Sequence, residues 1–193
     1  MGDKNVLIIS GPTGVGENAI FEELKKRYPN FVRLVTATTR KPRLDEKDKV
    51  AYYFMNNDEF KKEIEKGNIP EYQNSRDKEV FYGTYLPELR EKIAQGQIVV
   101  AMTDIAGSRY FKESHNATTI FILPDSMENL RKRHLNRDPD VKEEDLEKRL
   151  AYARREMDEE ADFYDFKVVN KQDKLNEAVD EIIEILKKEG YQL

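Results

Sequence analysis

The first 27 residues contain the arrangement that most constrains the fold, because an apolar run leads through a glycine-rich loop into a helical pattern. The apolar run is Val6–Ser10, the loop is Gly11–Asn18, and the helical pattern is Ala19–Arg27. This order is the setting of the phosphate-binding pattern G-x-x-x-x-G-K-[ST], in which backbone N–H groups converge on phosphate oxygens at a helix N-terminus. The chain is therefore expected to begin as a P-loop NTPase-type fold, with a strand, a phosphate-binding loop and a helix.

Two positions of this loop depart from the pattern. Glu17 stands in place of the lysine that would contact the β- and γ-phosphates, and Asn18 stands in place of the hydroxyl residue that would hold Mg²⁺. Glu17 reverses the charge, whereas Asn18 still offers a carbonyl oxygen to a hard cation and is a weak candidate metal ligand. Losing one such donor lowers a rate by roughly 10²–10³. An ordinary helix-capping turn with an acidic first turn is the alternative interpretation. The candidate phosphate-loop residues are Gly11, Pro12, Thr13, Gly14, Val15, Gly16, Glu17 and Asn18.

The rest of the chain alternates short apolar runs with helical patterns. The further strands are predicted at Val32–Ala37, Ile98–Thr103, Thr118–Leu123 and Phe166–Val169. The further helices are predicted at Leu86–Gln95, Ser126–Leu135, Glu143–Asp158 and Leu175–Lys188. Continuous apolar runs are typical of strands buried on both faces, so the pattern predicts an α/β fold in which helices flank a parallel sheet. Residues 36–86, with a short helix at Asp58–Lys66, and residues 126–160 interrupt the alternation and are predicted to leave the core sheet.

Composition excludes several classes of protein. The chain has 193 residues, enough for one compact domain, and its net charge of −5 argues against a general nucleic-acid binder. It has no cysteine, which excludes disulfides and thiolate metal sites and fits a cytoplasmic location. No apolar run approaches about 18 residues, so neither a membrane span nor membrane association is expected.

Four further motifs follow the second predicted strand: Thr38–Arg43, Tyr52–Phe54, Glu71–Tyr72 and Phe81–Thr84. Their series resembles the nucleoside-monophosphate-binding subdomain of guanylate kinases, and the order matches from Val6 to about Ile185. The resemblance implies one guanylate-kinase-like domain with a core (1–35, 87–125 and 161–193), an inserted GMP-binding subdomain (36–86) and a helical lid (126–160). Family members transfer the terminal phosphate of ATP to GMP with Mg²⁺. The expected partners are therefore GMP and ATP, and the expected state is a monomer or a homodimer.

The resemblance also assigns acceptor-site residues. It implies that the GMP phosphate is held by Arg40, Arg43, Tyr52 and Tyr82, with Thr36 at a family serine position, and that guanine is read by Glu71, Thr84 and Asp104. The chemistry agrees, since guanidinium groups form paired hydrogen bonds with phosphate and a carboxylate accepts from the paired N–H donors of guanine. Solvated surface arginines and packed tyrosines are the ordinary alternatives.

The predicted lid matches as well. By resemblance, Arg133, Arg137 and Arg149 close over the ATP phosphates as catalytic arginines, and Asn170 lies near the adenine ring. Arg133 and Arg137 are four residues apart and share one helix face. A solvated face with salt bridges is the alternative for a chain in which 37% of the residues are charged.

The departures from the family pattern gather at the expected ATP site, where Met102 also replaces the first aspartate of a D-x-D segment that retains Asp104. Three hypotheses remain open. The chain is a working guanylate kinase, in which a lysine such as Lys41, Lys47 or Lys49 substitutes on closure. Alternatively, it is an inactive relative that binds GMP or a phosphorylated peptide. As a third possibility, it is a kinase of the same fold with another phosphorylated acceptor.

Overall fold

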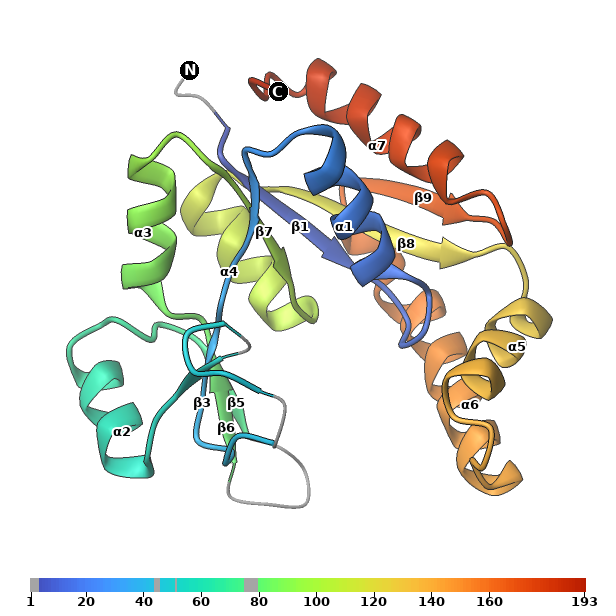
Figure 1. Ribbon diagram of the computed structural model, residues 1–193, viewed down its shortest axis with the longest axis horizontal. Helices are drawn as coiled ribbons and strands as arrows, with labels where there is room; N and C mark the ends of the chain where they lie inside the picture. Colours follow the sequence, from blue (N-terminus) through green and yellow to red (C-terminus); the bar gives the residue numbers. More distant parts are fainter. Residues whose placement is uncertain (1–3, 44–45, 51, 75–79) are drawn as a thin grey trace.

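A five-stranded parallel sheet forms the centre of the molecule in the computed structural model, which describes residues 4–43, 46–50, 52–74 and 80–193. Across the sheet the strands are β2 (Phe31–Arg33), β7 (Ile98–Met102), β1 (Val6–Ser10), β8 (Thr118–Pro124) and β9 (Phe166–Asn170). Their carboxyl ends share one edge of the sheet, and the phosphate loop leaves β1 at this edge (Figure 1).

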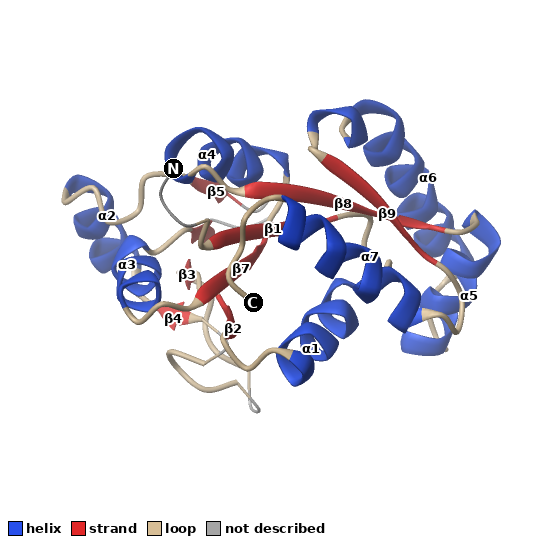
Figure 2. Cartoon of the chain, turned by 90° about the horizontal axis from the view of Figure 1, so that it is seen from above, coloured by secondary structure: helices blue, strands red, loops and turns tan. Residues whose placement is uncertain are grey.

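Helices cover both faces of this sheet, which explains why every residue of β1 is buried. Leu7 and Ile9 pack toward α1 (Glu17–Arg27) and α7 (Leu175–Lys188), which lie side by side on one face (Figure 2). Val6 and Ile8 pack on the opposite face, toward α3 (Leu86–Ala94) and α4 (Ile105–His115). The α/β fold with a parallel sheet flanked by helices is thus confirmed.

A second sheet and a helical pair extend from the central sheet. The second sheet has the order β4 (Tyr53–Phe54), β3 (Ala37–Thr38), β6 (Phe81–Gly83) and β5 (Tyr72–Asn74), and it packs with α2 (Asn57–Glu65). The helical pair is α5 (Met127–Arg137) and α6 (Glu143–Glu159), followed by the short 3₁₀ helix η1 (Ala161–Phe163). Figure 1 shows the second sheet and the helical pair on opposite sides of the molecule, below the central sheet. The division into core, acceptor subdomain and lid stays a prediction.

One expectation about the elements was wrong, and one helix was not foreseen. Residues 32–37 were predicted as one strand, but β2 ends at Arg33 and β3 belongs to the second sheet. The amide of Leu34 still donates to the Val100 carbonyl (2.8 Å), and the chain then crosses to the other sheet. Helix α4 was not predicted, although Asp104 caps it by accepting from the amides of Ala106 and Gly107. Within the described ranges, no helix has the length and apolar character needed to cross a membrane.

Candidate functional site

The loop between β1 and α1 has the backbone of an anion-binding turn. Gly14 and Gly16 have φ angles of 89° and 106°, in the left-handed region that favours glycine. A Cβ on Gly16 would lie 2.5 Å from Asn170 Nδ2, so a larger residue there would displace the amide that bonds to Val15. Gly16 is the N-cap of α1 and provides no side-chain hydrogen bond to the first turn. The N-terminal amides of α1 therefore remain available to an anion.

Two predicted nucleotide-binding side chains hold this loop in place. Arg133 Nη1 and Asn170 Nδ2 donate to the Val15 carbonyl oxygen at 2.7 and 2.8 Å. Arg133 Nη2 also donates to the carbonyl of Asn170 at 2.8 Å. These bonds join the loop to α5 and to the end of β9. Contacts of Arg133 with ATP phosphates and of Asn170 with adenine stay predictions.

The side chain of Glu17 faces an acidic pocket rather than an open surface. Asp104, Glu156 and Glu160 line the same pocket, whose volume is about 220 Å³. Burial and the charge of Glu156, offset in part by Arg33, raise the pKa of Glu17 to about 8. Burial and the charge of Glu160 raise the pKa of Glu156 to about 7. Near neutral pH, Glu17 is therefore mostly protonated and adds little negative charge to the loop.

Cationic side chains surround the rest of the loop. Arg133 and Arg137 of α5 line a pocket of about 520 Å³ together with the loop and Asn18. Arg149 lines a neighbouring pocket that includes Thr13, and its Nη1 lies 3.5 Å from Asp138 Oδ2. All three predicted lid arginines thus lie around the phosphate loop.

Asn18 and the acidic side chains are the candidate oxygen ligands for a cation. Asn18 Oδ1 already accepts a hydrogen bond from Arg33 Nη1 at 3.0 Å. In the part of the chain that the structure describes, no three His, Asp or Glu side chains are grouped as a metal site. Mg²⁺ often binds through one or two carboxylates together with substrate phosphates, and Asp104, which lines the pocket next to Glu17, offers such a carboxylate.

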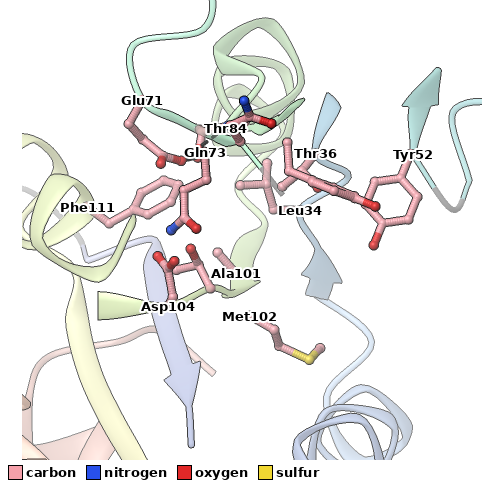
Figure 3. A pocket seen from close by; sticks show the side chains of 14 residues that line it. Leu34, Thr36, Tyr52, Glu71, Gln73, Thr84, Ala101, Met102, Asp104 and Phe111 are labelled. Carbon is pink, nitrogen blue, oxygen red and sulfur yellow. Dashed lines mark hydrogen bonds between the residues drawn. The ribbon is translucent and has the colours of Figure 1, made fainter. Parts of the chain in front are cut away.

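A fourth pocket, of about 260 Å³, lies between the central sheet and the second sheet. It brings together six of the predicted acceptor-site residues: Thr36, Tyr52, Glu71, Tyr82, Thr84 and Asp104. Glu71 Oε1 accepts from the amide and the hydroxyl of Thr84. Burial raises the pKa of Glu71 and these two bonds lower it in part, while the charge of Asp104 raises it. Figure 3 shows Glu71 and Asp104 reaching into the pocket from different elements.

The two arginines predicted to hold the acceptor phosphate both donate to Glu46, Arg40 through its guanidinium and Arg43 through its backbone amide. Arg40 Nη2 donates to Glu46 Oε1 at 2.7 Å, and the amide of Arg43 donates to Glu46 Oε2 at 2.8 Å. The Arg40 guanidinium also lies 5.5 Å from the centre of the Tyr52 ring. These hydrogen bonds lower the pKa of Glu46 to about 2. The described residues that line the pocket do not include Arg40 or Arg43.

Three side chains that line these pockets or contact a lining residue were not predicted from the sequence. Gln73 lines the acceptor pocket, and strand alternation could have found it, because it lies two residues after Glu71. Glu156 faces Glu17 from α6, and Arg33 contacts Asn18 from β2. No local pattern reveals either contact, since each depends on how separate elements pack.

Comparisons with known proteins agree with this architecture. The family model described as guanylate kinase matches residues 3–189. The chain is 37% identical over 185 residues to the guanylate kinase of Prochlorococcus marinus subsp. pastoris, which covers 95% of this chain and 97% of that protein. It is 38% identical over 186 residues to the guanylate kinase of Wolbachia sp. subsp. Brugia malayi, and this alignment covers 95% of this chain and 92% of that protein.

The chain belongs to the guanylate kinase family. A crystal structure of guanylate kinase from Anaplasma phagocytophilum superposes with a TM-score of 0.70 at 29% identity, covering all of this chain and 89% of that one. The resemblance noted from the sequence motifs is therefore confirmed, as is the P-loop NTPase-type fold. Membership in the family makes Glu17 and Asn18 the positions whose chemistry needs explanation.

Proposed function

We propose that the protein transfers the terminal phosphate of ATP to GMP in the presence of Mg²⁺ and forms ADP and GDP. The single observation that carries this proposal is the acceptor pocket, in which Glu71 and Asp104 present carboxylates beside Thr84. Guanine offers adjacent N–H donors on its Watson–Crick edge, which a carboxylate accepts in pairs, whereas adenine lacks this pattern. The pocket therefore favours a guanine nucleotide over other acceptors.

On the acceptor side, the hydroxyls of Tyr52 and Tyr82 are neutral donors to the GMP phosphate, because both side chains line the pocket. Arg40 is held next to Tyr52 by Glu46. An incoming phosphate competes with Glu46 for this guanidinium, since both ligands offer paired oxygen acceptors. We expect the Arg40 guanidinium to turn from Glu46 to the GMP phosphate when GMP binds, and the Arg43 side chain to bind the same phosphate.

On the donor side, the amides of the glycine loop and the N-terminus of α1 bind the ATP phosphates. Arg137 and Arg149 lie around the loop and neutralise charge that develops on the transferred group. Mg²⁺ would be held by ATP together with the carboxylate of Asp104, because Glu17 is mostly protonated near neutral pH, and the ion would supply further positive charge. A GMP phosphate oxygen then forms a bond to the γ-phosphorus, the bond from that phosphorus to the β–γ bridging oxygen breaks, and ADP leaves.

A second candidate function is an inactive domain that binds GMP or a phosphorylated peptide. The observation that favours it is Glu17, because an ionised carboxylate at the lysine position repels the donor phosphates. The raised pKa of Glu17 weakens this objection near neutral pH, since the protonated side chain carries no charge.

Calorimetry combined with a panel of acceptors separates the candidates. We expect GMP to bind, AMP and pyrimidine nucleoside monophosphates to bind at least ten-fold more weakly, and GMP to be the preferred acceptor with ATP and Mg²⁺. A better acceptor other than GMP would show that the fold serves another substrate. The double variant Glu17→Lys with Asn18→Ser tests the loop, because a large gain in kcat would show that the altered loop limits the rate. The cytoplasmic location and the monomeric or homodimeric state also stay proposals, and sedimentation of the purified chain tests the latter.

A further inference from the structure

The loop lacks its lysine, yet one arginine outside the lid lies against the first turn of α1. Arg33 is the last residue of β2, at the carboxyl end of an edge strand of the central sheet. Its Nη1 donates to Asn18 Oδ1 at 3.0 Å. Its charge also reaches Glu17, whose pKa it lowers. Arg33 therefore places a positive charge beside both residues that replaced the usual pair.

The other cations named above do not fill this position. Arg133 donates to backbone carbonyl oxygens of Val15 and Asn170, and Arg149 lies next to Asp138. Lys41, Lys47 and Lys49, suggested from the sequence, have no hydrogen bond or ion pair with the loop among the described residues. Arg137 approaches from α5, on the lid side. Arg33 is thus the cation that comes from the sheet side.

The guanidinium of Arg33 is available to a phosphate. Its hydrogen bond to Asn18 uses one of five N–H donors, and the acceptor is a neutral amide. Within the described segments, no carboxylate forms an ion pair with Arg33, and the residue is exposed. An arginine held by one neutral bond keeps a pair of donors free, and paired donors match two phosphate oxygens.

We propose that Arg33 replaces the missing loop lysine and binds the γ-phosphate of ATP, with Asn18 holding its guanidinium in place. The proposal rests on the proposed kinase function. The bond to Asn18 gives the substituted amide a positioning role, and the cation offsets whatever negative charge Glu17 carries. The positive charge that the family pattern places in the loop comes in this chain from Arg33, at the end of the edge strand β2.

The test compares Arg33→Ala and Arg33→Lys with Arg27→Ala. Arg27 is the last residue of α1, at the opposite end of the helix from Glu17, and it pairs with Glu23 and Asp180. Its loss therefore shows the effect of removing an arginine that does not contact the loop. We expect Arg33→Ala to lower kcat about 10²-fold, Arg33→Lys to retain most of the rate, and Arg27→Ala to leave kcat within two-fold. In a Glu17→Lys background, Arg33→Ala should lower kcat less than ten-fold, because the restored lysine supplies the same charge.

Calorimetry gives a second readout that does not need turnover. Arg33→Ala should weaken binding of ATP–Mg²⁺ about ten-fold and leave ADP binding unchanged, since only ATP carries the γ-phosphate. Equal losses for ATP and ADP, or a kcat within two-fold of the unsubstituted protein, would overturn the assignment of Arg33. A chain that forms no GDP but shows the selective loss of ATP affinity would refute the proposed function and leave the role of Arg33 intact.

Discussion

Replacing Glu17 with glutamine should stabilise the fold, and the gain should depend on pH. Burial and Glu156 raise the pKa of Glu17 from 4.5 to about 8 in the folded chain. Between these pH values the folded state keeps a proton that the unfolded chain has released. Stability therefore falls as pH rises through this window, because the folded state binds more protons. Glutamine has a similar shape and never ionises, so the variant escapes this loss.

The size of the effect follows from the two pKa values. The interval from 4.5 to about 8 corresponds to at most about 5 kcal/mol, at 1.36 kcal/mol for each pH unit. Part of the pKa shift of Glu17 comes from the charge of Glu156, whose own pKa is about 7, and the pocket next to Glu17 admits solvent. Both effects reduce the free energy below this upper limit. We therefore expect a gain of about 2–3 kcal/mol above pH 8, which raises Tm by roughly 5–10 °C for a chain of this size.

Urea unfolding followed by circular dichroism between pH 4 and pH 9 measures this difference. The matched control is Glu22→Gln, which changes an exposed glutamate of the same helix. The Glu17→Gln gain should be absent at pH 4, grow through the window and level off above pH 8, while the control stays within about 0.5 kcal/mol throughout. A gain that does not vary with pH, or a loss of stability above pH 8, would refute the reasoning.

Three further substitutions test other parts of the account. Glu71→Gln should raise KM for GMP about 10–100-fold in a coupled assay, because one acceptor oxygen becomes a donor that faces guanine. An unchanged KM would show that Glu71 does not contact guanine. Gly16→Ala should lower the free energy of unfolding, measured with urea, by about 1–3 kcal/mol, because φ is 106° and the new Cβ would lie 2.5 Å from Asn170 Nδ2. A stability equal to that of the unsubstituted protein would show that the loop relaxes without cost. Tyr53→Phe should lower the free energy of unfolding by about 1–2 kcal/mol in the same assay, because the Tyr53 hydroxyl donates to the buried Glu88 at 2.5 Å. An unchanged free energy of unfolding would mean that water replaces this hydrogen bond.

Much of the central fold could be predicted from the sequence because its signals are local. The strand Val6–Ser10 is a continuous apolar run, and the buried stripe of α7 is visible as Val179, Ile182, Ile183 and Leu186. The second sheet has strands of only two or three residues, which leave no periodic pattern. Its existence follows from tertiary pairing, such as that of Thr38 with Tyr82, and not from local preference.

Some residues of the candidate site could likewise be predicted from local motifs, whereas others depend on tertiary packing. Glu71, Thr84 and Asp104 were found from motif order, and the structure brings them to one pocket. Arg33 and Glu156 could not be found, because their importance depends on β2 and α6 lying next to the first turn of α1. The sequence suggested a replacement lysine in or shortly after Thr38–Arg43, whereas the structure offers an arginine at the end of the edge strand β2.

Our central claim is that this member of the guanylate kinase family transfers phosphate from ATP to GMP despite its altered phosphate loop. Direct measurement of the two products, ADP and GDP, tests it. The unsubstituted protein is incubated with ATP, Mg²⁺ and GMP, and ADP and GDP are quantified by chromatography. We predict equal amounts of ADP and GDP, and loss of both when Mg²⁺ is chelated. GMP binding by calorimetry with no GDP formed, or ADP released without GDP, would contradict the account.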